Sequence, residues 1–100
     1  DSYGIIFDEG QVKRVAIRTD TRQAKYFRSV PLHHSQQEVL HDSYSIFYYN
    51  IKITPDFVQE LLSYGPNLTV LGPPELCGIM VDSLRRTLDN YMNPSTSSKA

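Results

Sequence analysis

The stretch Tyr64–Leu76, which reads YGPNLTVLGPPEL, most constrains how this chain can fold. Gly65 can take a positive φ at no steric cost, so it suits the position just past a helix end, and the proline after it cannot continue a helix. Asn67–Leu71 is long enough for one short strand. Pro74 suits the first turn of a further helix, where its missing N–H would be unpaired anyway. The stretch therefore predicts a helix, a strand and a second helix in close succession.

The residues before this stretch predict a strand, a helix and a hairpin. In Gln11–Arg18, Val15 and Ile17 lie two residues apart with Arg14, Ala16 and Arg18 at the positions between, which indicates a strand with one buried face. A helix over residues 21–29 follows, with Asp20 or Thr21 as its N-cap, and it ends before Pro31. Residues 35–41 and 44–53 form a predicted hairpin, whose turn is Asp42-Ser43.

The remaining helices complete an α+β domain. Thr54-Pro55-Asp56 supplies an N-cap and an N-terminal proline for one helix, and the last helix runs from about Pro74 to Tyr91. The element order is β-α-β-β-α-β with an additional C-terminal helix. Short connections and right-handed crossovers make this a ferredoxin-like sandwich, with two helices over one face of a four-stranded antiparallel sheet. We expect the additional helix to cover a sheet edge or to lie against a neighbouring domain.

The longest strand predicts what each sheet face carries. Phe47, Tyr49, Ile51 and Ile53 alternate along residues 44–53 and should face the core. The other side of the strand carries further tyrosines, which suggests that this face is partly covered too.

Length and composition allow one domain with a modest core, since the chain has 100 residues of which 40% are hydrophobic. We expect a linker from a preceding domain over residues 1–10, the domain itself over 11–92 and a disordered tail over 93–100. The chain begins without Met or a signal peptide, so we expect a piece of a longer protein. No apolar run approaches the ~20 residues that span a bilayer. The single cysteine, Cys77, excludes an internal disulfide and a cysteine-based zinc cluster.

Positive charge gathers in the first third of the chain, although the net charge is only −1. Six of the ten Lys and Arg residues lie there: Lys13, Arg14, Arg18, Arg22, Lys25 and Arg28. Such a cluster can hold phosphates or a nucleic-acid backbone. An ordinary solvated outer face is the more common origin of such charge.

The residues that carry catalysis in other proteins do not form a recognisable pattern here. His33, His34 and His41 lack a metal-ligand spacing, and Ser35 beside His34 is sequence adjacency only. There is no nucleophile elbow, paired-carboxylate pattern or glycine-rich phosphate loop. Cys77 is most simply a small buried hydrophobe. We expect no enzyme, no cofactor and no metal.

Tyrosines on the long strand leave two interpretations open. Tyr44, Tyr48 and Tyr49 could stack bases, as an aromatic sheet face does in RNA-recognition motifs. The sequence run typical of that module is absent. Cross-strand packing or an interface is the more common use of such residues.

Short motifs spread over the chain resemble a known family. In order they are Val15-Ala16-Ile17-Arg18, Ala24, Tyr26-Phe27-Arg28, His33-His34-Ser35-Gln36, Ile46–Ile51, Leu61–Gly65, Val70–Pro73 and Leu76. Together they resemble the C-terminal extension, or WCX domain, of WYL-domain transcriptional regulators, over about Tyr3 to Tyr91. The family often has a glycine in the hairpin turn where this chain has Asp42-Ser43, which leaves the turn type open.

The resemblance implies a ferredoxin-like domain of a bacterial, cytoplasmic regulator. Its partners would be the winged helix-turn-helix and WYL domains of the same protein, which this chain lacks, and a second copy in a homodimer. The domain would couple sensing of a nucleic-acid or nucleotide-like effector to DNA binding, with no membrane partner. Arg18, Arg22, Arg28, His33 and Gln36 are the residues that we expect to contact the effector or a nucleic acid.

Two other readings share the same element order. A small-ligand sensor of ACT type binds at a turn after the first strand that often contains glycine, and Arg18-Thr19-Asp20 has none. An acylphosphatase-like enzyme needs a phosphate loop near the first strand, which we do not find, and a fold alone carries no activity.

Overall fold

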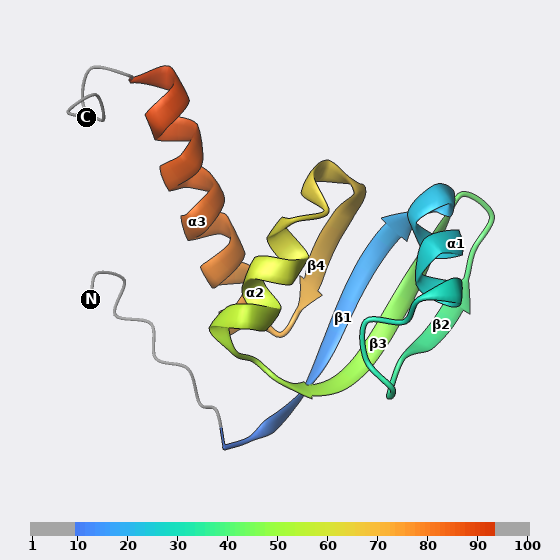
Figure 1. Cartoon of the computed structure of the whole chain (residues 1–100). Helices are drawn as coiled ribbons and strands as arrows, with labels where there is room; N and C mark the ends of the chain where they lie inside the picture. Colours follow the sequence, from blue (N-terminus) through green and yellow to red (C-terminus); the bar gives the residue numbers. More distant parts are fainter. Residues whose placement is uncertain (1–9, 94–100) are drawn as a thin grey trace.

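The structure, a computed structural model, describes residues 10–93 of the chain (Figure 1). The linker and tail expected at the two ends therefore fall almost wholly outside the described residues. The elements are β1 (Val12–Asp20), α1 (Thr21–Ser29), β2 (Gln37–Leu40), β3 (Tyr44–Lys52), α2 (Pro55–Leu62), the 3-10 turn η1 (Gly65–Asn67), β4 (Leu68–Gly72) and α3 (Pro74–Met92). The predicted α+β class is confirmed.

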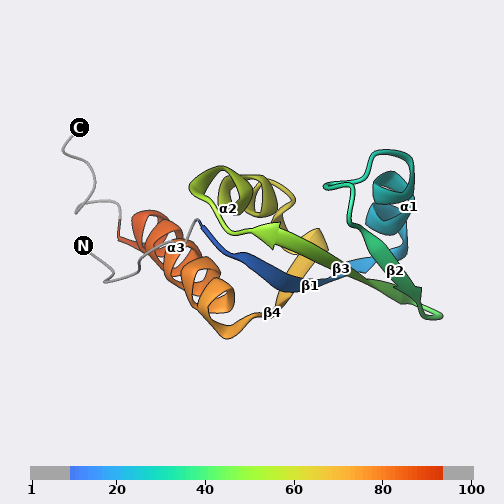
Figure 2. The same cartoon turned by 90° about the horizontal axis from the view of Figure 1, so that it is seen from below.

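The four strands form one antiparallel sheet in the order β2-β3-β1-β4. β1 and β3 pair along their whole length, and Ile17 of β1 lies opposite Phe47 on one side and Val70 on the other. Helices α1 and α2 lie on the same side of the sheet (Figure 2). The core therefore lies between this side of the sheet and the helices.

Helix starts follow the capping residues that the sequence contains. The Asp20 carboxylate accepts a hydrogen bond from the Gln23 backbone N–H at 2.8 Å, so Asp20 rather than Thr21 is the N-cap of α1. The Thr54 hydroxyl accepts one from the Phe57 N–H at 3.2 Å at the start of α2. β1 runs two residues beyond its predicted end, because Asp20 still pairs with Tyr44 across the ladder.

From α2 to α3 the predicted order of helix, strand and helix is present, with one added 3-10 turn before the strand. Gly65 has a φ of 60°, as expected for a residue just past a helix end. It opens the η1 turn, so β4 begins one residue later than predicted. Pro74 opens α3 as expected.

The core confirms the predicted inner face of the long strand. Phe47 and Tyr49 are fully buried, and Ile53 is nearly so. Phe27 of α1 meets Phe47 edge-on at a ring-centroid distance of 5.6 Å, and meets Tyr64 in the same way at 5.0 Å. Edge-to-face pairs at these distances add to the stabilisation that burial alone supplies.

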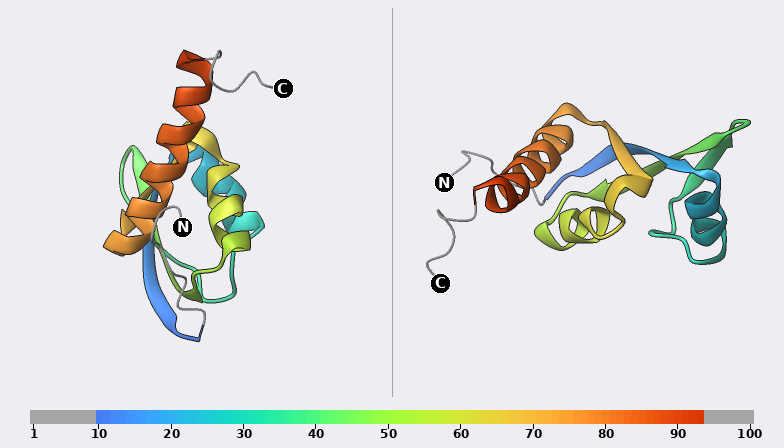
Figure 3. Two further views of the ribbon diagram at one scale, coloured as in Figure 1. Left: turned by 90° about the vertical axis from the view of Figure 1, so that its left-hand side faces the viewer. Right: turned by 90° about the horizontal axis from the view of Figure 1, so that it is seen from above.

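Helix α3 is only half packed. Leu76 and Met80 in its first turns belong to the core, and the ion pair between Lys13 and Glu75, at 3.5 Å, joins its start to β1. Farther along, Leu84 and Leu88 are 53% and 56% exposed. The helix passes β4 and continues beyond the sheet (Figures 1 and 3). The apolar stripe of α3 is therefore buried in its first half only.

Candidate functional site

The described part of the chain contains no cluster of three or more His, Cys, Asp or Glu side chains that could hold a metal ion. It also contains no helix long and apolar enough to cross a lipid bilayer. Cys77 is a half-buried free thiol, whose Sγ lies 3.5 Å from the Val70 carbonyl oxygen.

The five residues predicted to contact a ligand lie in three different places. Arg18 lies on β1, on the sheet face opposite α1 and α2. Arg22 and Arg28 lie on α1. His33 and Gln36 lie in the loop between α1 and β2. In the described part of the chain these five residues therefore do not line a single pocket. Binding by any of them stays a prediction.

Gln36 holds its loop to the core. Its side-chain N–H donates to the Phe27 carbonyl at 2.9 Å, and its amide oxygen accepts from the Tyr49 hydroxyl at 2.6 Å and from the Leu32 backbone N–H at 3.2 Å. Burial is the main cause that raises the pKa of the Tyr49 hydroxyl, so this hydroxyl stays a donor at neutral pH. The three bonds give Gln36 a structural role.

His33 is also held within the loop. Its Nδ1 lies 2.8 Å from the Ser35 hydroxyl, and that hydroxyl accepts from the Asn50 backbone N–H of β3 at 2.9 Å. The His34 ring lies 4.1 Å from the His33 ring. Burial, followed by repulsion from His34, lowers the pKa of His33, which favours its neutral form at pH 7.

Arg28 is paired with a carboxylate of the neighbouring strand. Its Nε and NH2 groups donate to the two Glu38 oxygens at 2.7 and 2.6 Å, and the buried Ser45 hydroxyl donates to Glu38 at 2.6 Å. These hydrogen bonds, that of Arg28 foremost, lower the pKa of Glu38, and the same pair raises the pKa of Arg28. The bidentate pair links α1 to β2 and leaves little of the Arg28 charge for a ligand.

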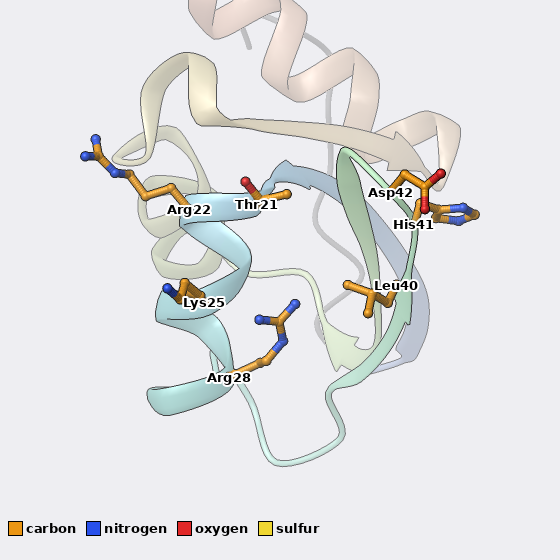
Figure 4. A pocket seen from close by; sticks show the side chains of 7 residues that line it. All are labelled: Thr21, Arg22, Lys25, Arg28, Leu40, His41 and Asp42. Atoms are coloured by element: carbon orange, nitrogen blue, oxygen red, sulfur yellow. The ribbon is translucent and has the colours of Figure 1, made fainter.

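An open hollow of about 750 Å³ lies beside this pair, between α1 and the β2–β3 turn (Figure 4). Figure 4 shows Arg28 directed from α1 toward β2, whereas Arg22 points away from the hairpin. Asp42 adds a carboxylate on the other side of the hollow. The residues that line the hollow are Thr21, Arg22, Lys25, Arg28, Leu40, His41 and Asp42.

The second surface is the sheet face that α1 and α2 leave open, which we call the open face. The Arg14 guanidinium lies over the Tyr48 ring, 4.8 Å from its centroid, and the Arg18 guanidinium lies over the Tyr44 ring at 5.5 Å. On the same tyrosine, the His41 ring is stacked at 4.4 Å with an interplanar angle of 16°. The expected partial cover of the two tyrosines thus comes from arginine and histidine side chains.

Sequence reasoning missed Arg14 and His41 as members of this surface. The signal for Arg14 was the two-residue period of β1 and β3, which puts Arg14 and Arg18 on the side of Tyr44 and Tyr48. For His41 no such signal existed, because its position depends on how the hairpin turns back.

The structure defines a small α+β domain, in which exposed arginine and histidine side chains and half-buried tyrosines lie on the open face of its sheet. The chain matches the family model of the WCX domain over residues 11–88, and it belongs to that family. The resemblance drawn from the short motifs is thereby confirmed. WCX membership points to a regulatory C-terminal domain of WYL-type regulators. A comparison with curated proteins finds no match.

Proposed function

We propose that this chain is a regulatory and interaction domain of a WYL-type transcriptional regulator in the bacterial cytoplasm. It would couple effector sensing and dimerisation to DNA binding by a helix-turn-helix elsewhere in the protein. The observation that carries the proposal is the WCX match over residues 11–88. The strand order, with β1 and β3 at the centre of the sheet, supports a ferredoxin-like arrangement.

The exposed half of α3 supports a role in contacts with a partner. Val81, Leu84, Leu88 and Tyr91 continue the helix face of the buried Leu76 and Met80, at spacings of three and four residues, and all four are about half exposed or more. A stripe of this kind beyond the end of the sheet is typical of an interaction surface. We assign it to the dimer contact of the full-length regulator.

The hollow beside α1 is a candidate for part of an effector pocket. Arg22 and Lys25 border it without an ion pair in the described part of the chain. A WYL domain packed against α1 would close the hollow and strengthen these charges, since exclusion of water lowers the local dielectric constant. The matching effector would be anionic, such as a nucleotide-like molecule.

A stand-alone ACT-type sensor receives less support. β1 ends at Asp20 and α1 begins at Thr21, so no loop residue separates them. A ligand-binding turn at this position has therefore no residues from which to form.

The proposal is tested by the double variant Leu84→Ser/Leu88→Ser in the full-length regulator. A buried leucine contributes roughly 1.5–3 kcal/mol, so we expect the dimer dissociation constant to rise at least about tenfold. Affinity for the operator should fall with it, because a dimer binds two half-sites at once. Sedimentation equilibrium and operator titrations measure the two quantities.

Arg85→Ser is the matched control, because Arg85 is exposed on α3 and lies outside the stripe. It should leave both quantities within about twofold of wild type. Unchanged dimerisation and unchanged operator affinity in the double leucine variant would refute the proposed role of α3.

A further inference from the structure

The open face combines residues from two strands and a turn. Arg14 and Arg18 lie four residues apart on one face of β1, and Tyr44 and Tyr48 lie four residues apart on the same face of β3. The register places Arg14 and Tyr48, and likewise Arg18 and Tyr44, in diagonal positions across the central strand pair. No helix of the described chain lies over this part of the sheet on that side (Figures 2 and 3).

The two arginines keep their charge available. Within residues 10–93 neither forms an ion pair with a carboxylate; Arg14 makes one long hydrogen bond, 3.5 Å from the Asn50 side-chain oxygen. By contrast, Arg28 is neutralised by Glu38 and Lys13 by Glu75. Of the basic cluster in the first third of the chain, the open face therefore holds a pair of guanidinium groups free to meet phosphates.

The aromatic groups supply planar surfaces beside these charges. Arg18 and His41 both stack on the Tyr44 ring, and the His41 side chain is exposed. Tyr48 with Arg14 forms a second stack, four residues farther along β3, a spacing of about 13 Å. Bases stack on Tyr and His rings and on arginine planes alike.

We propose that the open face, formed by Arg14, Arg18, His41, Tyr44 and Tyr48, binds single-stranded nucleic acid. Bases would stack at the two ends of the array, and the guanidinium groups would pair with phosphates between them. A duplex keeps its bases stacked inside and offers only phosphates to such a surface, so the single strand binds more tightly. This activity belongs to the chain itself and does not depend on the proposed regulator function.

A protein partner is the competing occupant, because Ile46 and the exposed Val39 add apolar area to the same face. Two unpaired arginines would then require acidic groups on the partner. The polyanion is favoured because it satisfies both arginines and offers planar groups to the stacks.

The test is fluorescence anisotropy of the 100-residue chain with labelled oligothymidylate and oligouridylate of about 12 nucleotides, and with a duplex of equal length. Titrations cover about 50 to 200 mM salt. We expect salt-sensitive binding of the single strands, at least about fivefold tighter than binding of the duplex. Arg14→Ser/Arg18→Ser should weaken it at least about tenfold and reduce the salt slope by about 1.4, which corresponds to two phosphate contacts.

Two further variants distinguish the contribution of stacking from that of net charge. Tyr48→Leu keeps an apolar side chain and should weaken binding at least about fivefold without changing the salt slope, because stacking is largely independent of salt. Arg85→Ser/Arg86→Ser removes the same charge from the exposed surface of α3 and should change the affinity no more than about twofold. Circular dichroism verifies that each variant is folded.

Three results would overturn the proposal. The first is no single-strand binding at about 50 mM salt. The second is a loss of binding in Arg22→Ser/Lys25→Ser together with wild-type binding in Arg14→Ser/Arg18→Ser, which moves the site to α1. The third is self-association of the chain that Arg14→Ser/Arg18→Ser abolishes, without nucleic-acid binding, which makes the face a protein contact.

Discussion

At the scale of single residues, Gln36 joins three parts of the molecule. Its amide bonds the end of α1 at Phe27, the loop at Leu32 and the buried hydroxyl of Tyr49 on β3. A buried polar group that loses its partner costs more than the bond itself contributes. Gln36 therefore acts on stability before it can act on binding.

We predict that Gln36→Ala lowers the free energy of unfolding by about 2 kcal/mol, because Tyr49 is left with an unpaired buried hydroxyl. Urea denaturation of the chain measures this loss. Gln37→Ala, at the exposed neighbouring position, should stay within about 0.5 kcal/mol of wild type. If Gln36→Ala and Gln37→Ala had the same free energy of unfolding, the structural role of Gln36 would be contradicted.

The same residue shows what sequence could and could not provide for the candidate site. The two-residue period of β1 and β3 contains the information that places Arg14 and Arg18 on the side of Tyr44 and Tyr48, although this grouping was missed. Gln36 was expected to meet a ligand, yet its partners are three groups that come together only after folding. Polar residues in loops have no periodic pattern that reveals such partners.

At the scale of elements, the pair of Arg28 and Glu38 joins α1 to β2. Glu38 is half-buried and also accepts from the buried Ser45 hydroxyl, so the carboxylate is bonded from two sides. Its pKa lies below the ordinary value of 4.5 in the folded state. A carboxyl with a lowered folded pKa stabilises the fold above its unfolded pKa, and this contribution is lost as the pH falls through the folded pKa.

Glu38→Gln should therefore lower stability near neutral pH, and the difference from wild type should shrink as the pH falls below 4.5. Thermal unfolding between pH 7 and pH 3 follows the difference. Glu60→Gln on the exposed side of α2 serves as the control. A difference between wild type and Glu38→Gln that is constant over this pH range would contradict the assignment.

Most element boundaries were predictable because local chemistry fixes them. The N-cap residues Asp20 and Thr54 and the proline at the start of α3 mark helix starts directly. β2 is shorter than its predicted range of 35–41, since Ser35 and Gln36 use their side chains to hold the loop. Such competition between side chains and the ladder depends on tertiary structure.

At the scale of the whole molecule, the architecture of one sheet with two helices on a single face leaves two surfaces without cover in the described residues. One is the open face, and the other is the distal half of α3. The apolar residues of α3 recur at helical spacing along its whole length. That only Leu76 and Met80 enter the core depends on where the sheet ends, which no periodicity specifies.

We propose that this domain acts through contacts with the rest of a regulator. Hydrogen–deuterium exchange tests it most directly, by comparing the amides of residues 81–91 in the 100-residue chain with the same amides in the full-length regulator. We expect markedly slower exchange of this segment in the regulator, because a partner would cover its apolar stripe. Equal exchange rates in the two proteins would contradict the claim, because α3 would then be as exposed in the regulator as it is here.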